Sequence, residues 1–221
     1  FAGCSSLPEV TLPAGITTIP SSTFQGCTSL AKVRFEGAVT SIDAMAFLNA
    51  KVSDIVLPES LTSIGQMAFS GSALKGALVI PAAVKTIGAQ AFAYSGITEI
   101  GGTDSSADKV KLIGYGAFIA TTNLASVNLP AVETIAEFAF GTATDDKGNT
   151  YSPVITSLSI PNVKSIGKAA FAYQSGITQI LIPKCEYIGI AAFMGCSGIE
   201  SLNISSAKTI EQYAFYGNKF A

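Results

Sequence analysis

Cysteine, histidine and the acidic residues are the side chains on which most catalytic and metal chemistry depends. This chain of 221 residues has four cysteines and fifteen Asp and Glu, but no histidine. It therefore lacks the commonest general base, the commonest metal ligand and the usual partner of a nucleophilic Ser or Cys. The carboxylates are scattered singly, and no spacing among them suggests a pair for general acid and base catalysis. We expect no catalytic residues, no metal and no cofactor, and hence a protein that is not an enzyme.

The densest group of oxygen ligands lies in the segment TATDDKGNTYSP (142–153). Asp145, Asp146 and Asn149 offer oxygens of the kind that Ca²⁺ binds, but their spacing is not that of a recognised calcium loop and no terminal acidic ligand follows. Gly, Asp and Asn are typical of an exposed loop, and DKGN is a plausible hairpin turn. We interpret the segment as a loop, with a calcium site as the less favoured alternative.

Cys4 lies in the opening FAGCSS, which raises two other possibilities. A lipobox-like Phe-Ala-Gly before the cysteine would make it the acylated residue of a lipoprotein. FQGC at 24–27 and FMGC at 193–196 have the same pattern, however, which favours a repeated structural segment. Cys4 and Cys27 would lie one repeat apart, within disulfide reach in principle, although a cysteine at a recurrent buried position is more often a small apolar filler.

The cysteine motif belongs to an internal repeat that runs along the whole chain. Phenylalanines recur mostly every 22 or 23 residues, and every one after the first has Ile five residues before it. The recurring phenylalanines are Phe1, Phe24, Phe47, Phe69, Phe92, Phe118, Phe140, Phe171, Phe193 and Phe215. Most are also preceded directly by Ala. Because of this spacing, we expect Phe and Ile to form ladders inside a stack of similar units.

Each repeat predicts the same order of short elements. In segments such as LASVNLP (124–130) and ITQILIP (177–183), apolar residues recur at alternate positions near the end, as in a strand with one buried face. The final Pro ends the strand. A turn and a second short strand follow, as in VKTIG (84–88) and VKSIG (163–167). The Ala and Phe after that strand have the spacing of a single helical turn. We predict a repeat solenoid of about nine units.

The unit L-x-x-V-x-L-P followed by V-x-x-I-G-x-x-A-F-x-G-C resembles the BspA-type leucine-rich repeat. The resemblance covers nearly the whole chain, with Pro absent at Phe35-Glu36 and Ile204-Ser205 and Thr23 in place of Ala. It implies a right-handed leucine-rich-repeat superhelix in a bacterial protein that is exported and displayed on the cell surface. Members of this family are associated with adhesion to host proteins and to other cells.

Composition and organisation agree with a scaffold of this kind. Hydrophobic residues make up 48% of the chain and charged residues 13%, with a net charge of −2. Neither a basic surface for nucleic acid nor a polybasic segment for acidic lipids is expected, and no apolar run is long enough to span a bilayer. We predict one domain over 1–221, with insertions at 101–109 and 142–153. It is expected to be part of a longer protein, because the chain begins within a repeat.

The exposed positions of the first strand form two neighbouring columns along the predicted stack. Solenoids bind partners through such side-by-side strands. The centre of a protein interface is often Tyr, Trp or Arg, and in these columns only Arg34 is of one of these types. The candidate binding residues are Glu9, Lys32, Arg34, Asp54, Glu99, Ser126 and Asn128. Proteins are the expected partners. One alternative is a glycan-binding module, which the dispersed tyrosines do not favour. The other is a rigid stalk that presents another domain.

Overall fold

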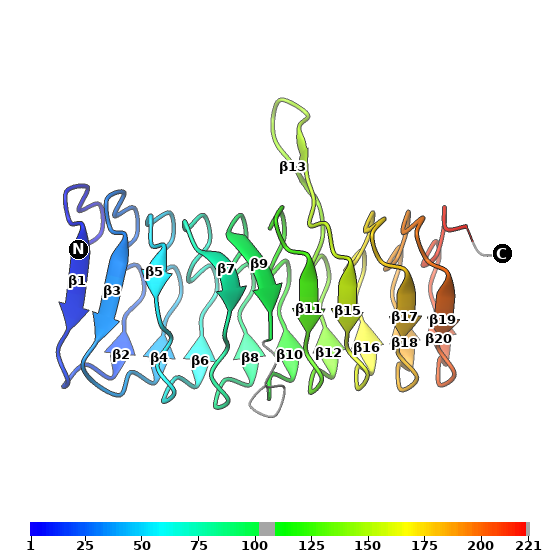
Figure 1. The fold of residues 1–221 in the computed structure, drawn as a ribbon, viewed down its shortest axis with the longest axis horizontal. Helices are drawn as coiled ribbons and strands as arrows, with labels where there is room; N and C mark the ends of the chain where they lie inside the picture. Colours follow the sequence, from blue (N-terminus) through cyan, green and yellow to red (C-terminus); the bar gives the residue numbers. More distant parts are fainter. Residues whose placement is uncertain (102–108, 220–221) are drawn as a thin grey trace.

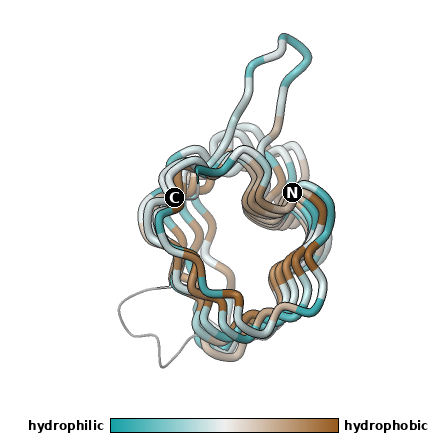
Figure 2. Tube along the Cα trace, turned by 90° about the vertical axis from the view of Figure 1, so that its right-hand side faces the viewer, coloured by the Kyte–Doolittle hydropathy of each residue, from teal (hydrophilic) through white to brown (hydrophobic). Residues whose placement is uncertain are grey.

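The computed structural model describes residues 1–101 and 109–219. These residues form an elongated solenoid of about nine turns, in which each turn of the chain lies directly on the one before (Figure 1). Seen along the stack, the turns superpose into a single ring, and one hairpin projects from it (Figure 2). The predicted repeat solenoid is confirmed. Among the described residues no helix is long and apolar enough to cross a membrane.

One side of the ring carries a strand of two to five residues in each turn, and we call this side the front face. Its strands pair in parallel within three separate sheets, of order β1-β3-β5, β7-β9-β11-β15 and β17-β19. The strands are β1 (Glu9–Leu12), β3 (Lys32–Phe35), β5 (Asp54–Ile55), β7 (Lys75–Leu78), β9 (Gly96–Ile100), β11 (Ser126–Asn128), β15 (Ser157–Ser159), β17 (Gln179–Leu181) and β19 (Ser201–Asn203).

A second side, which we call the back sheet, is a continuous nine-stranded parallel sheet of two-residue strands. Each strand ends on the recurring Ile, which is buried in the core from β2 to β18, as the pattern predicts, whereas Ile210 at the end of the stack is half exposed. The strands are β2 (Thr18–Ile19), β4 (Ser41–Ile42), β6 (Ser63–Ile64), β8 (Thr86–Ile87), β10 (Leu112–Ile113), β12 (Thr134–Ile135), β16 (Ser165–Ile166), β18 (Tyr187–Ile188) and β20 (Thr209–Ile210).

The third side consists of consecutive β-turns around the recurring Phe, and the predicted helical turn is not confirmed there. In the turn at Phe47, Met45 and Asn49 have φ values of 59° and 56°, which interrupt a right-handed helix. Ala46 N–H donates to Asp43 O at 3.3 Å within the turn, whereas Phe47 N–H donates to Ala68 O of the next repeat at 2.8 Å. Repeats with the pattern F-x-G have glycine at the position equivalent to Asn49, as at Gly26, because glycine adopts a left-handed φ without steric strain.

The core is built from ladders of identical side chains. Eight of the recurring phenylalanines, from Phe24 to Phe193, are fully buried. Neighbouring rings stack nearly parallel, with centroids 5.0 to 5.5 Å apart. Since the same residue recurs at the same place in each turn, every unit covers the apolar face of its neighbour, and no unit needs to bury that face alone.

The insertion at 142–153 forms the projecting hairpin of β13 (Ala143–Thr144) and β14 (Thr150–Tyr151), which pair antiparallel. The predicted hairpin turn is thus confirmed. The carboxylate of Asp145 accepts hydrogen bonds from the backbone N–H of Lys147 and Asn149, from the Asn149 side chain and from Tyr151 Oη, at 2.8 to 3.1 Å. These donors lower the Asp145 pKa, and they give this carboxylate a role in the turn. The other insertion, 101–109, lies almost wholly outside the described residues.

The four cysteines are free in the structure. Cys27, Cys185 and Cys196 are buried, and burial raises the pKa of Cys185 and Cys196 to about 11. The thiols of Cys27 and Cys196 each contact a backbone oxygen of the preceding repeat at 3.1 Å, namely Phe1 O and Phe171 O. The interpretation of the recurrent cysteine as a small core residue agrees with this packing.

Ion pairs cross adjacent strands on the back sheet. Lys111 and Lys164 both contact Glu133, with N–O distances of 2.7 and 2.6 Å, and Lys208 contacts Glu186 at 2.8 Å. The register explains the three-residue group, because Thr134 pairs with Leu112 on one side and with Ser165 on the other. Hydrogen bonds from Lys111 and then Lys164 lower the pKa of Glu133 from 4.5 to about 2.

Glu133→Gln is expected to change how stability depends on pH. Because the folded-state pKa is depressed, the carboxylate stabilises the fold fully above its unfolded pKa of 4.5, and this contribution is lost as the pH falls through about 2. Urea unfolding of both proteins at pH 7, 4 and 2 should show a small gap in stability that closes towards pH 2. A gap of constant size would contradict the prediction. The effect is small because solvent screens these side chains.

Candidate functional site

The register of the front face places the predicted residues in two groups. Glu9, Lys32 and Asp54 are direct neighbours on β1, β3 and β5, and Arg34 lies two residues beyond Lys32. Glu99 and Ser126 are direct neighbours on β9 and β11, and Asn128 follows on β11. The predicted columns therefore exist, but they are divided between two sheets. The first sheet ends at β5 and the second begins at β7.

Arg34 and Asp54 form the strongest polar contact of the first group. The guanidinium donates two hydrogen bonds to the carboxylate, at 3.0 Å (Nη1 to Oδ1) and 2.7 Å (Nη2 to Oδ2). The hydrogen bonds from Arg34 lower the pKa of Asp54, and the charge of Lys32 acts in the same direction. Both side chains are about half exposed, so the pair adds little to stability. It holds the guanidinium in a fixed position at the surface.

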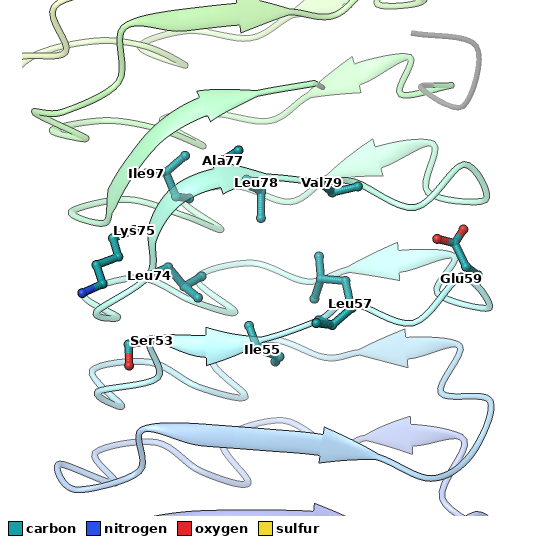
Figure 3. A pocket seen from close by; sticks show the side chains of 11 residues that line it. Ser53, Ile55, Leu57, Glu59, Leu74, Lys75, Ala77, Leu78, Val79 and Ile97 are labelled. Atoms are coloured by element: carbon teal, nitrogen blue, oxygen red, sulfur yellow. The ribbon is translucent and has the colours of Figure 1, made fainter. Parts of the chain in front are cut away.

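Two grooves lie on either side of Val56, directly after β5. One, of about 370 Å³, lies between β3 and the end of β5 and includes Arg34 and Asp54 in its wall. The other, of about 310 Å³, lies between β5 and β7 and is lined mainly by aliphatic side chains (Figure 3). Val56 itself is 76% exposed, and Val79 on the next turn is 65% exposed. The front face thus combines a fixed charge pair with apolar surface.

The second groove coincides with a gap in the front face. No Cα atom of β5 lies within 8 Å of one in β7, whereas paired strands are about 4.8 Å apart. Figure 1 shows this separation as wider than that between neighbouring front strands. Ile55, Leu57, Leu74, Leu78 and Ile97 contribute to the groove wall, while Lys75 and Glu59 stand at its opposite ends (Figure 3).

Sequence reasoning missed the grooves, and the spacing within the repeats does not single out the gap. Phe47 is eight residues before its core-facing strand residue Ile55, whereas Phe24 and Phe69 are nine residues before Val33 and Leu78. The one-residue step between β3 and β5 leaves these two strands paired in register. Between β7 and β9 a similar step is absorbed by a bulge, and between β5 and β7 the pairing stops.

Other kinds of site have less support within the described residues. No group of three or more Cys, Asp and Glu side chains is arranged to hold a metal ion in residues 1–101 and 109–219. Tyr94 and Tyr173 occupy the same place in their repeats and are half exposed. Two other repeats, however, lie between the repeat of Tyr94 and that of Tyr173. They do not form the contiguous aromatic platform on which a sugar would stack.

Comparison with protein families identifies the repeat. A model described as the BspA type leucine rich repeat region matches residues 1–109 and 105–221, with six copies. The chain belongs to the BspA-type leucine-rich repeat family. No curated protein matches it.

Solved structures of bacterial leucine-rich repeat proteins resemble this BspA-type chain. A leucine-rich repeat protein from Bacteroides ovatus has a TM-score of 0.54 and 21% identity, and the match covers 91% of this chain and 68% of that one. A leucine rich cell surface protein from Faecalibacterium prausnitzii has a TM-score of 0.45 and 21% identity, covering 90% and 60%. The pneumococcal vaccine antigen PcpA has a TM-score of 0.41 and 16% identity, covering 96% and 62%. The first of these shows the shared fold.

BspA-type repeats make the chain a repeat scaffold, in keeping with a protein-interaction module. In such scaffolds a rigid core presents side chains from many turns on one surface. The front face of this BspA-type chain has that form, because its core ladders fix the strands that carry Arg34 and Asp54, and Val56 directly follows β5.

Proposed function

We propose that this chain is a non-catalytic scaffold of the bacterial cell surface that binds other proteins, in adhesion to host proteins or other cells. The binding surface is the front face from β1 to β11, centred on Arg34 and Val56. Arg34, which Asp54 holds in the wall of one groove, and Val56, which lines this groove and the next, carry the proposal. Arg is enriched at the centres of protein interfaces, where apolar pockets exclude water around it.

The location at the cell surface and the role in adhesion follow from what the family resemblance implies. The front face supports the choice of a protein partner, because a sugar-binding site would be expected to use adjacent aromatic rings, and the seven predicted residues include none. A rigid stalk without a ligand of its own is the competing function. It would leave the fixed charge pair and the exposed Val56 without a role.

The test is binding of the purified chain to immobilised host matrix and plasma proteins, with a glycan array alongside. Arg34→Glu places two carboxylates together on the front face and should weaken protein binding roughly tenfold or more. Lys208→Glu is the matched control, since it breaks an exposed ion pair of the same kind on the back sheet. Binding that both variants weaken equally, or neither weakens, would remove the front face as the site. Absence of binding on both panels would favour the stalk.

A further inference from the structure

The gap between β5 and β7 leaves two strand edges that face each other without backbone partners. At the start of other front strands, a backbone N–H donates to the preceding turn, as Asp54 N–H does to Ala31 O at 3.0 Å and Gly96 N–H to Leu74 O at 2.8 Å. The corresponding bond, from Lys75 N–H to Ser53 O, is absent from the described backbone. By the alternation of a parallel strand, Ile55 also directs its backbone groups into the gap.

The opening is confined to the front of this one junction. On the turn side, Phe47 N–H donates to Ala68 O and Asn49 N–H to Ser70 O, both at 2.8 Å. On the back sheet, Ile64 pairs with Ile87. The two turns are therefore held together along two sides and stand apart on the third, so that the gap is a local feature of a continuous stack.

A second interruption of the front face differs in its width. The strands β15 and β17 are also unpaired, but their Cα atoms come within 8 Å of each other. An inserted strand needs its two neighbours about 9.6 Å apart, which is twice the normal strand spacing. Of these two interruptions, the β5–β7 gap is the one in which all Cα atoms of the facing strands are more than 8 Å apart, and a groove lies there.

We propose that an extended, aliphatic peptide segment of a partner protein binds in the gap as an additional strand between β5 and β7. Unpaired strand edges are templates for strand addition. The peptide backbone would bond to both edges, and alternate side chains would enter the aliphatic groove beside Leu57 and Leu78. This inference rests on the proposed function, because it names the chemistry of the protein segment that the front face receives.

Charges at the two ends of the groove add a requirement for the ends of the peptide. Lys75 and Glu59 are both exposed and lie at opposite ends. A matching segment therefore has an acidic side chain at the end that lies beside Lys75 and a basic side chain at the end beside Glu59. If the peptide bound in the opposite direction, the acidic and basic residues would exchange places between its N-terminal and C-terminal ends.

The probes are two fluorescein-labelled peptides, Asp-Val-Thr-Val-Thr-Val-Lys and Lys-Val-Thr-Val-Thr-Val-Asp, titrated with the full chain. We expect saturable binding of one of them, which gives the direction of insertion. The same peptide with the backbone nitrogens of its two Thr residues methylated should bind at least roughly tenfold more weakly, because it loses donors to a strand edge. No saturable binding of either peptide would overturn the proposal.

Val56→Asp places a charge at the rim of the groove and should weaken binding of the peptide roughly tenfold or more. Val56 is highly exposed, so the substitution should not prevent folding. Leu181→Asp is the matched control, because Leu181 is an exposed aliphatic residue on a front strand that is paired to β19. Equal effects of the two variants would contradict insertion at this gap.

Amide hydrogen exchange of the free chain tests the gap without any ligand. The amides of Ile55 and Lys75 should exchange much faster than that of Val33, whose strand is paired on both edges, and they should become protected when the peptide binds. Equal protection of the three amides in the free chain would overturn the proposal. If the peptide fails while Arg34→Glu still weakens binding of a partner protein, the proposed function stands and strand insertion falls.

Discussion

Phe118→Ala is expected to destabilise the solenoid by about 3–5 kcal/mol, the range for removing a buried aromatic side chain. Phe118 is fully buried in the middle of the ladder, and its ring stacks on Phe92 and Phe140, with centroids 5.4 Å apart on both sides. The substitution removes apolar burial and two ring contacts at once. It also leaves a cavity that the rigid stack cannot easily close, because its neighbours are fixed by their own turns.

Phe1→Ala is the control for this prediction. Phe1 holds the same place in its repeat, but it is 69% exposed and stacks on one ring, that of Phe24. Its removal should cost less than about 1 kcal/mol, since little surface returns to water. Urea unfolding followed by far-UV circular dichroism measures both variants. Similar losses for Phe1→Ala and Phe118→Ala would contradict the view that the buried ring ladder is the main source of stability.

Gln174→Ala is expected to cost about 2–4 kcal/mol, because two buried backbone groups lose their partner. Gln174 is fully buried. The equivalent positions in two other repeats are occupied by Cys27 and Cys196. Its side chain accepts a hydrogen bond from Ile155 N–H at 3.2 Å and donates to Phe140 O at 3.3 Å. It also donates to Ser152 Oγ at 3.1 Å. The amide thus replaces pairing that the hairpin insertion interrupts.

Gln174→Met separates the hydrogen bonds from packing, since it keeps most of the side-chain volume. We expect it to be nearly as destabilising as Gln174→Ala, and we expect faster amide exchange at Ile155 in both variants. Cys196→Ala, at the same repeat position, should cost only about 1 kcal/mol. If Gln174→Met were as stable as the natural chain, the amide would have no structural role at the insertion.

The sequence predicts most of the stack because its period determines the register. The columns of exposed front-strand residues follow from repeat spacing alone, and the structure places Glu9, Lys32 and Asp54 as neighbours in one of them. The ion pairs of Lys111 with Glu133 and of Lys208 with Glu186 likewise join neighbouring repeats. A parallel stack of equivalent units leaves little choice of partner for such residues. The additional contact from Lys164 to Glu133 follows from the same register, across a hairpin insertion that lengthens the spacing in sequence.

Local backbone geometry was harder to predict than register. The spacing of Ala and Phe fits one turn of helix as well as it fits consecutive β-turns. The choice depends on residues with positive φ, such as Met45 and Tyr94, which are not glycine. Tertiary contacts impose this conformation, since the amides of these turns bond to the next repeat. The β5–β7 gap depends likewise on how a one-residue change in spacing is absorbed, which the repeat pattern alone does not specify.

The most direct test of the binding face is hydrogen exchange of the natural chain with and without a protein partner found on the binding panel. The account predicts slower exchange of backbone amides in β3, β5 and β7 when the partner is bound, with the back sheet from β2 to β20 unchanged. Protection confined to the back sheet or to the β13–β14 hairpin, with the front strands unchanged, would contradict it.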